Sequence, residues 1–256
     1  VYDEYTVINK SLFIGSIHHN DLDSLIISNT QIKKIAVTGP SDNAFVEVEL
    51  KGINISNNAD ELGLAINFAN ISVENCHFMN NYNQGIYITE SNVNIIDCII
   101  SNNGNTSSIG GGLRIEGGEE LRSNVLIDGC SINNNSADNY GGGIFSDQST
   151  IVIKNSTISY NSSYLGGGLW ADHSSIINID STDIFNNTAI HNGGGISASD
   201  WAEISISNTN IKWNEAEQYT GGGIQCGSIT KITLENTHVD SNSSNLRGGG
   251  YYHSAQ

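Results

Sequence analysis

A glycine triplet recurs along the chain and constrains its fold more than any other feature. Gly-Gly-Gly occurs at 110–112, 141–143, 166–168, 193–195, 221–223 and 248–250. A motif that returns at a nearly constant interval is typical of solenoids, in which each repeat packs only on its neighbours. The chain is therefore expected to be a stack of similar coils.

A second pattern lies between the triplets and repeats every 22 to 32 residues. It centres on a usually small residue, which in successive repeats is Thr30, Ile53, Cys76, Cys98, Cys130, Ser156, Thr182, Thr209 and Thr237. The residues five and three positions before this centre and two positions after it are apolar in all nine repeats, although only 38% of the chain is hydrophobic. A spacing of two is the period of a β-strand, and the Ile and Val that dominate here favour strands.

A third short strand is predicted after each glycine triplet, with alternate residues pointing inward. Three strands per repeat, each paired with its counterpart in the next repeat, predict an all-β parallel β-helix of about nine to ten coils over residues 21–256. Residues 1–20 fit the pattern poorly and are predicted to be an N-terminal cap or docking segment. Because the pattern stops within a coil, we expect the chain to continue further or another protein subunit to stack on it end to end.

Two columns of polar residues support the predicted turns. The residue before each centre is Asn, Asp or Gly in eight of nine repeats, and these types tolerate the left-handed backbone of a tight bend. Five residues after the centre, eight repeats have Asn. Stacked amides can bond to one another and to the turn backbone, so this column predicts a buried asparagine ladder.

The charge of the chain excludes two classes of partner. Ten basic residues against 27 acidic ones give a net charge of -17, which repels nucleic acid and anionic lipid surfaces. No run approaches the roughly 20 apolar residues of a membrane-spanning helix. Neither nucleic-acid binding nor membrane insertion is expected.

Two short motifs resemble those of a known family. The first is Phe78-Met79-Asn80-Asn81, which resembles the F-x-x-N repeat of polymorphic outer membrane proteins. The second is the Gly-Gly-Gly-Ile of residues 141–144, which resembles the G-G-A-[ILV] repeat of the same family. More widely, residues 20 to 253 resemble the right-handed β-helices of the pectin-lyase-like superfamily. The resemblance implies a right-handed coil, which is also the general preference for parallel strands.

The resemblance implies display outside the cell rather than a specific ligand. The first hypothesis is therefore an extracellular or cell-surface structural or adhesive module that is not an enzyme, with protein subunits or glycans as partners. The second is a polysaccharide lyase or glycoside hydrolase whose groove lies on the strand that follows the glycine triplets.

The second hypothesis depends on residues that point outward from that strand. Glu116, Asp147 and Asp172 would stack in adjacent coils about 5 Å apart, close to the carboxylate separation of retaining glycosidases. Tyr87, Phe145 and Trp170 stand two residues before an acidic or polar position of this row and are candidates for carbohydrate contact. They would lie beside the acidic residues.

Metals, cofactors and disulfides have weaker signals. The seven His residues lack partners at zinc-ligand spacing, so no metal site is predicted; calcium would have only a generally acidic surface to bind, and no cofactor is expected. Cys76, Cys98 and Cys130 share one interior column, where neighbouring Cα atoms lie within disulfide range. One bridge is predicted, Cys76–Cys98 before Cys98–Cys130, with small buried thiols as the alternative.

Nine sequons would carry N-linked glycans if the chain followed a eukaryotic secretory route. The favoured sites are Asn9, Asn54, Asn70, Asn105, Asn134 and Asn186. Asn155, Asn161 and Asn242 are weaker candidates, because they fall in the two polar turn columns.

Overall fold

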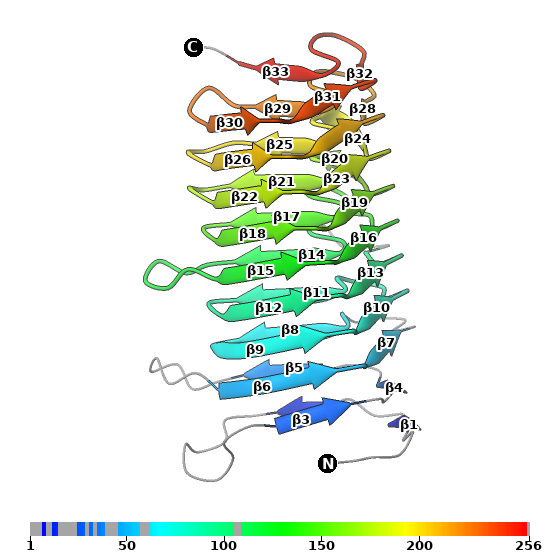
Figure 1. Ribbon diagram of the computed structural model, residues 1–256, viewed down its shortest axis with the longest axis vertical. Coiled ribbons are helices and arrows are strands. Elements are labelled where there is room, and N and C mark those ends of the chain that lie inside the picture. The colour runs from blue at the N-terminus through cyan, green and yellow to red at the C-terminus, as the bar shows by residue number, and fades with distance from the viewer. Residues whose placement is uncertain are drawn as a thin grey trace.

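A computed structural model describes residues 7–8, 12–14, 25–28, 31–32, 35–38, 46–56, 62–104 and 109–254. These residues form a stack of coils in which every strand pairs in parallel with its counterpart in the next coil (Figure 1). The all-β parallel β-helix predicted from the sequence is confirmed. The described residues include no helix that is long and apolar enough to cross a membrane.

Three long sheets run along the stack, and each coil visits sheets C, A and B in turn. Sheet C contains β3 (Leu25–Ser28), β6 (Val46–Lys51), β9 (Ala69–Glu74), β12 (Asn92–Ile96), β15 (Asn124–Asp128), β18 (Thr150–Lys154), β22 (Ile176–Asp180), β26 (Glu203–Ser207) and β30 (Lys231–Glu235). Sheet A contains β1 (Val7–Ile8), β4 (Gln31–Ile32), β7 (Asn54–Ser56), β10 (His77–Met79), β13 (Ile99–Ser101), β16 (Ser131–Asn133), β19 (Thr157–Ser159), β23 (Asp183–Phe185), β27 (Asn210–Lys212) and β31 (His238–Asp240).

Sheet B carries the strands that follow the glycine triplets. It contains β2 (Leu12–Ile14), β5 (Ile35–Thr38), β8 (Leu64–Asn67), β11 (Ile86–Thr89), β14 (Leu113–Glu116), β17 (Ile144–Asp147), β21 (Leu169–Asp172), β25 (Ile196–Ala198), β29 (Ile224–Cys226) and β33 (Tyr251–His253). The later coils add a fourth, unpredicted sheet D between sheets A and B, made of β20 (Ser162–Leu165), β24 (Thr188–Asn192), β28 (Glu215–Ala216) and β32 (Ser243–Ser244).

The apolar columns fill the interior. Ile153 of β18 pairs in register with Ile127 of β15 and Ile179 of β22, and all three are 0–1% exposed. Leu234 and Tyr251 depart from the prediction of burial, with about 40% of each residue exposed, because they belong to the last coil described and no other coil covers them. From Val48 onward, the other apolar members of the columns are buried or packed against the core.

The turns have the backbone that the sequence predicts. The residue before each centre has a positive φ in every described repeat from 52 to 236, for example +51° at Asn75 and +65° at Gly129. The first glycine of each triplet is also left-handed, with φ +65° at Gly166. The second lies against the neighbouring coil, since a Cβ on Gly167 would come within 2.6 Å of the Gly194 carbonyl oxygen. Glycine is therefore required at the first position of the triplet by the backbone conformation and at the second by the close approach of the neighbouring coil.

The asparagine ladder predicted from the sequence is present. Asn187 Nδ2 donates to Ile158 O and to Asn214 Oδ1, each at 2.9 Å, and the Asn214 amide oxygen also accepts from the Asn187 backbone N–H at 2.9 Å. The same pattern runs through Asn81, Asn103, Asn135, Asn161, Asn187, Asn214 and Asn242. The ladder supplies partners to backbone groups that the corner would otherwise bury unpaired.

Removing one amide of the ladder should cost stability although no charge is involved. Asn187→Ala leaves the Asn161 backbone N–H and the Ile158 carbonyl without these partners, so we expect a loss of about 3 kcal/mol in the free energy of unfolding. Urea denaturation measures it. The control is Asn178→Ala, an exposed amide on sheet C, which should change stability by less than about 0.5 kcal/mol; equal effects in the two variants would contradict the structural role of the ladder.

The structure bears on two further predictions. The boundary at residue 20 stays a prediction, although β1 and β2, which lie within residues 1–20, pair with β4 and β5 and continue sheets A and B into this segment. The predicted Cys76–Cys98 disulfide is absent, since all four cysteines are free and buried. Each sulfur of the column accepts instead from a backbone N–H of the preceding coil, as in Cys76 N to Cys98 Sγ at 3.4 Å. The thiols thus act as small buried polar groups like the Ser and Thr of the later coils.

The predicted glycosylation sites differ in accessibility. Asn134 and Asn155 are exposed, whereas the sequon at Asn161 is wrong as a glycan site because this side chain is buried in the ladder. Asn54, Asn70, Asn186 and Asn242 are half-buried, and their use remains a prediction. Asn9 and Asn105 lie outside the described residues.

Candidate functional site

An acidic row lies on the outer face of sheet B, on the strands that follow the glycine triplets. The register pairs Glu116 of β14 with Asp147 of β17, and Asp147 with Asp172 of β21. These are the three residues that the sequence offered as catalytic candidates, and the fold brings them together in adjacent strands. Each side chain is 17–29% exposed, so the row is reachable yet partly withdrawn from water.

Glu116 forms a closed cluster with its neighbours. It accepts from the Tyr87 hydroxyl at 2.7 Å and from Arg114 Nε at 2.8 Å, and the Arg114 guanidinium lies 4.7 Å from the centre of the Tyr87 ring. Burial, followed by the bond to Glu116 and its charge, raises the pKa of Tyr87 to about 12. Tyr87 is therefore a protonated donor near neutral pH. Its hydrogen bond to Glu116, together with the ion pair between Arg114 and Glu116, holds the three side chains in place.

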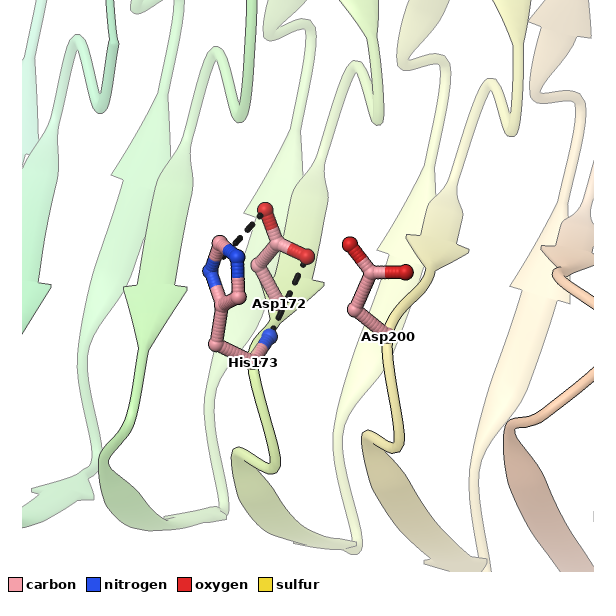
Figure 2. A group of neighbouring side chains, drawn as sticks. All are labelled: Asp172, His173 and Asp200. Atoms are coloured by element: carbon pink, nitrogen blue, oxygen red, sulfur yellow. Dashed lines mark hydrogen bonds and ion pairs between the residues drawn. The ribbon is translucent and has the colours of Figure 1, made fainter.

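Asp147 and Asp172 hold a histidine that the sequence analysis did not single out. His173 Nδ1 lies 3.1 Å from Asp147 Oδ1 and 3.5 Å from Asp172 Oδ2. Figure 2 shows the imidazole beside Asp172, whose carboxylate also accepts from the His173 backbone N–H at 3.1 Å. The Ser199 hydroxyl donates to Asp172 Oδ1 at 2.6 Å. Side chains of the adjacent strands β17 and β21, together with Ser199, thus fix the orientation of the His173 imidazole.

The environment of this histidine resembles that of a positioned base. Since a carboxylate only accepts, Nδ1 carries the proton that bonds to Asp147, which leaves Nε2 of the neutral ring with its lone pair. The His173 side chain is 55% exposed, so that nitrogen can meet a ligand. Burial, together with the charges of Asp172 and Glu116, raises the pKa of Asp147 against the opposing effect of His173.

A cation could meet three ligand atoms near this point. Atoms of Asp172, His173 and Asp200 all lie within 4.8 Å of one another, and Figure 2 shows Asp200 reaching in from the next coil. Nothing beyond this proximity points to a metal, and the Asp172 carboxylate already accepts two hydrogen bonds. The bonds observed here orient the imidazole.

A groove of about 610 Å³ adjoins the histidine at the turn between sheets B and C. Its lining includes Arg122, His173, Asp200 and Trp201, and Trp201 is 67% exposed. Arg122 comes from the longer turn after β14 and is anchored by its Nη2, which donates to the Ser174 carbonyl oxygen at 2.9 Å. These residues lie in turns outside the repeating columns, so the sequence pattern does not indicate them. The position of His173 directly after Asp172 is the one signal in the sequence.

The proposed carbohydrate contacts at Phe145 and Trp170 are corrected. Both side chains point outward but are only 5% and 8% exposed, because Tyr140 lies over them with ring-centre distances of 6.4 Å and 4.9 Å. Tyr140 is itself 37% exposed and presents the outer aromatic surface here. Tyr87 is half-buried in the cluster with Glu116.

Comparison with known proteins agrees with the architecture. A family model described as a right-handed β-helix region matches residues 7–150, which also supports the predicted handedness. No curated protein matches the sequence.

Among solved structures, the chain is similar to the A-module of the mannuronan C-5 epimerase AlgE6 from Azotobacter vinelandii, with a TM-score of 0.54 and 15% sequence identity. The alignment covers 91% of this chain and 65% of that chain, so this chain spans somewhat less than two thirds of the epimerase module. This likeness contradicts the prediction that the chain is not an enzyme, because a solved structure with the same fold is an enzyme. At this identity the likeness itself shows the fold.

Proposed function

The chain belongs to the family of right-handed β-helix regions, and on that premise we propose that it is an enzyme that modifies a uronic acid polysaccharide by removing the proton on the carbon beside a sugar carboxylate. The observation that carries the proposal is the His173 imidazole, held through Nδ1 by Asp147 at 3.1 Å with Asp172 at 3.5 Å, at the edge of an open groove. A base oriented by a carboxylate is a recurrent arrangement in proton transfer.

The substrate class follows from the groups around the groove. Among the residues that line the groove, Arg122 has the guanidinium group, and such a cation suits a sugar carboxylate. The lining also includes Glu119, Glu120 and Asp200, so Arg122 is the group there that would attract an anionic sugar. The exposed Trp201 ring offers an apolar surface for a sugar ring. The activity for which the structural relative is named, C-5 epimerisation of mannuronan, supports the same class of polymer.

The proposed reaction begins when His173 Nε2 takes the proton from C5 of the uronate. The electron pair of the broken C–H bond delocalises into the sugar carboxylate, and an arginine side chain offsets the added negative charge. The imidazolium that forms is stabilised by the carboxylates of Asp147 and Asp172. Return of a proton from water to the opposite face of C5 inverts that carbon, and His173 then gives its proton to the solvent. Alternatively, expulsion of the oxygen at C4, which takes a proton from water as it leaves, forms the C4–C5 double bond and cleaves the chain.

We also propose that the protein works outside the cell. A polysaccharide is too large to be brought to an internal enzyme intact, and the acidic surface with its net charge of -17 favours solubility of the free protein. An adhesive or filament-forming role has no support among the contacts described.

The test is incubation of the purified chain with mannuronan and with polygalacturonate in deuterated water. We expect one of two results by NMR: either an inverted C5 that carries deuterium, or a sugar with a C4–C5 double bond at a new non-reducing end. The double variant Asp147→Asn/Asp172→Asn should lose this activity by at least about a hundredfold, whereas Asp240→Asn, an exposed carboxylate on sheet A, should retain it. New reducing ends with neither deuterium at C5 nor an unsaturated sugar would indicate hydrolysis and overturn the proposal, as would the absence of any change in both polymers.

A further inference from the structure

An aromatic surface crosses three coils of the later half of the stack, along sheet A and away from the His173 groove. Tyr160 follows β19, Phe185 ends β23 and Trp213 follows β27. The rings of Tyr160 and Phe185 meet edge to face with centres 5.8 Å apart, and Trp213 and Phe185 line one shallow hollow of about 190 Å³. These three residues are called the aromatic platform below.

Two members of the platform are bulky residues at a turn position where the other coils have Asn or Ser. The turn position just before each ladder asparagine has a φ near +55° in every coil from 80 to 241. Other coils place residues there that accept a left-handed backbone more readily, namely Asn80, Asn102, Asn134, Asn186 and Ser241. Tyr160 and Trp213 adopt the same angle, +56° and +55°, although bulky side chains disfavour it. Departures from local preference are expected at functional positions.

The two rings are also not used to build the core. Tyr160 is 55% exposed and Trp213 is 58% exposed, so the fold gains little from their apolar area. Exposed aromatic rings grouped in this way mark interaction surfaces. The conformational cost and the exposure together indicate that the rings serve a ligand.

Polar groups at the rim suit a hydroxylated and negatively charged ligand. Asn210 Nδ2 donates to Asp183 Oδ1 at 2.8 Å beside the hollow, and both side chains can also bond to hydroxyl groups. Lys212, which pairs in register with Phe185, lines the same hollow and forms no ion pair with any described residue. A cation beside exposed aromatic rings on a strongly acidic chain favours an anionic sugar over a protein or a neutral apolar partner.

We infer that the aromatic platform is a second, non-catalytic binding surface for a polysaccharide chain of uronic acids, whose sugar rings stack on Trp213 and Tyr160. Adjacent coils are about 4.8 Å apart, so the two rings, two coils apart, would contact separate sugars of one chain. For the class of polymer this inference rests on the proposed function. Its effect is to hold the polymer on the solenoid while the groove acts elsewhere along it.

Affinity electrophoresis in gels that contain mannuronan tests the platform without requiring turnover. Trp213→Asn and Tyr160→Asn introduce the residue that most other coils have at this position, so the melting temperature should be unchanged or higher. We expect each variant to bind mannuronan about tenfold more weakly. Trp213→Tyr should keep most of the binding, and Lys212→Gln should weaken binding to mannuronan but not to a neutral glucan.

The control is Tyr82→Ser, which removes an exposed tyrosine outside the platform and should leave binding unchanged. Folded Trp213→Asn protein that binds as tightly as the parent overturns the inference, and so does a parent that mannuronan does not retard. Repeating the series with His173→Ala separates the two proposals. In that background, Trp213-dependent binding should persist although C5 exchange is lost. In the protein with His173 intact, Trp213-dependent binding without C5 exchange would defeat only the proposed reaction, and exchange without Trp213-dependent binding would defeat only the platform.

Discussion

Replacement of Ile153 by Asp is expected to destabilise the central coils severely. Ile153 is fully buried, and its neighbours in the two adjacent coils are the buried Ile127 and Ile179. A carboxylate there would find no cation and no hydrogen-bond donor in the column, and burying such a charge costs several kcal/mol. Because a protein's whole stability is about 5–15 kcal/mol, we expect a loss of at least about 5 kcal/mol and a melting temperature lower by about 10–20 °C.

Val152→Asp is the matched control for this change. Val152 is the preceding residue of the same strand, but its side chain is 37% exposed on the outer face of sheet C. The same carboxylate there remains hydrated, so the melting curve followed by circular dichroism should move by only a few degrees. If the two variants melt together, the inward and outward alternation of β18 would be wrong.

The architecture could be predicted because equivalent residues of successive coils have the same environment, so each structural requirement recurs in the sequence of every repeat. Ile127, Ile153 and Ile179 occupy equivalent positions and face the same environment, so one buried column appears as one column of apolar letters. The left-handed turn at Asn75 and the ladder at Asn187 follow from side chains with a known local preference. Each apolar or turn residue alone is a weak indication of structure, but its recurrence in every coil makes the prediction of a solenoid strong.

The candidate site was predictable only in part, because only some of its residues lie in the repeating columns. Glu116, Asp147 and Asp172 lie on strands, so the repeat placed them in one row. His173, Arg122 and Trp201 lie in turns whose length and path differ between coils, and no periodic pattern relates them. Burial of Trp170 likewise depends on Tyr140 from the preceding coil, a contact that strand alternation does not show. Sheet D was missed because its strands have two to five residues and occur only in the later coils.

Replacement of His173 by Ala should remove the proposed base and leave the fold intact. The imidazole is more than half exposed and contributes no core contact, so the melting temperature should change little. Proton transfer by a positioned side chain is worth about 10²–10⁴-fold in rate, and we expect C5 deuterium exchange on mannuronan to fall by that factor. His238→Ala, an exposed histidine on sheet A, is the control and should keep the parent rate. An active His173→Ala enzyme would refute the role of this residue.

The pH profile distinguishes a chemical role of the pair from a structural one. Burial and the charges of Asp172 and Glu116 raise the pKa of Asp147, so this carboxylate gains its proton at a higher pH than an ordinary aspartate as the solution is acidified. Once protonated, it no longer accepts from His173 Nδ1 as an anion and no longer stabilises the imidazolium, and the rate should fall through this range. In Asp147→Asn the rate should be lower at every pH, since the charge is gone. Its decline on acidification should also move to lower pH, because the Asp147 carboxyl, whose pKa is raised in the parent, no longer titrates. Rates of C5 exchange measured between mildly acidic and neutral pH would show this shift, and a variant profile that is merely scaled down from the parent would assign Asp147 a structural role alone.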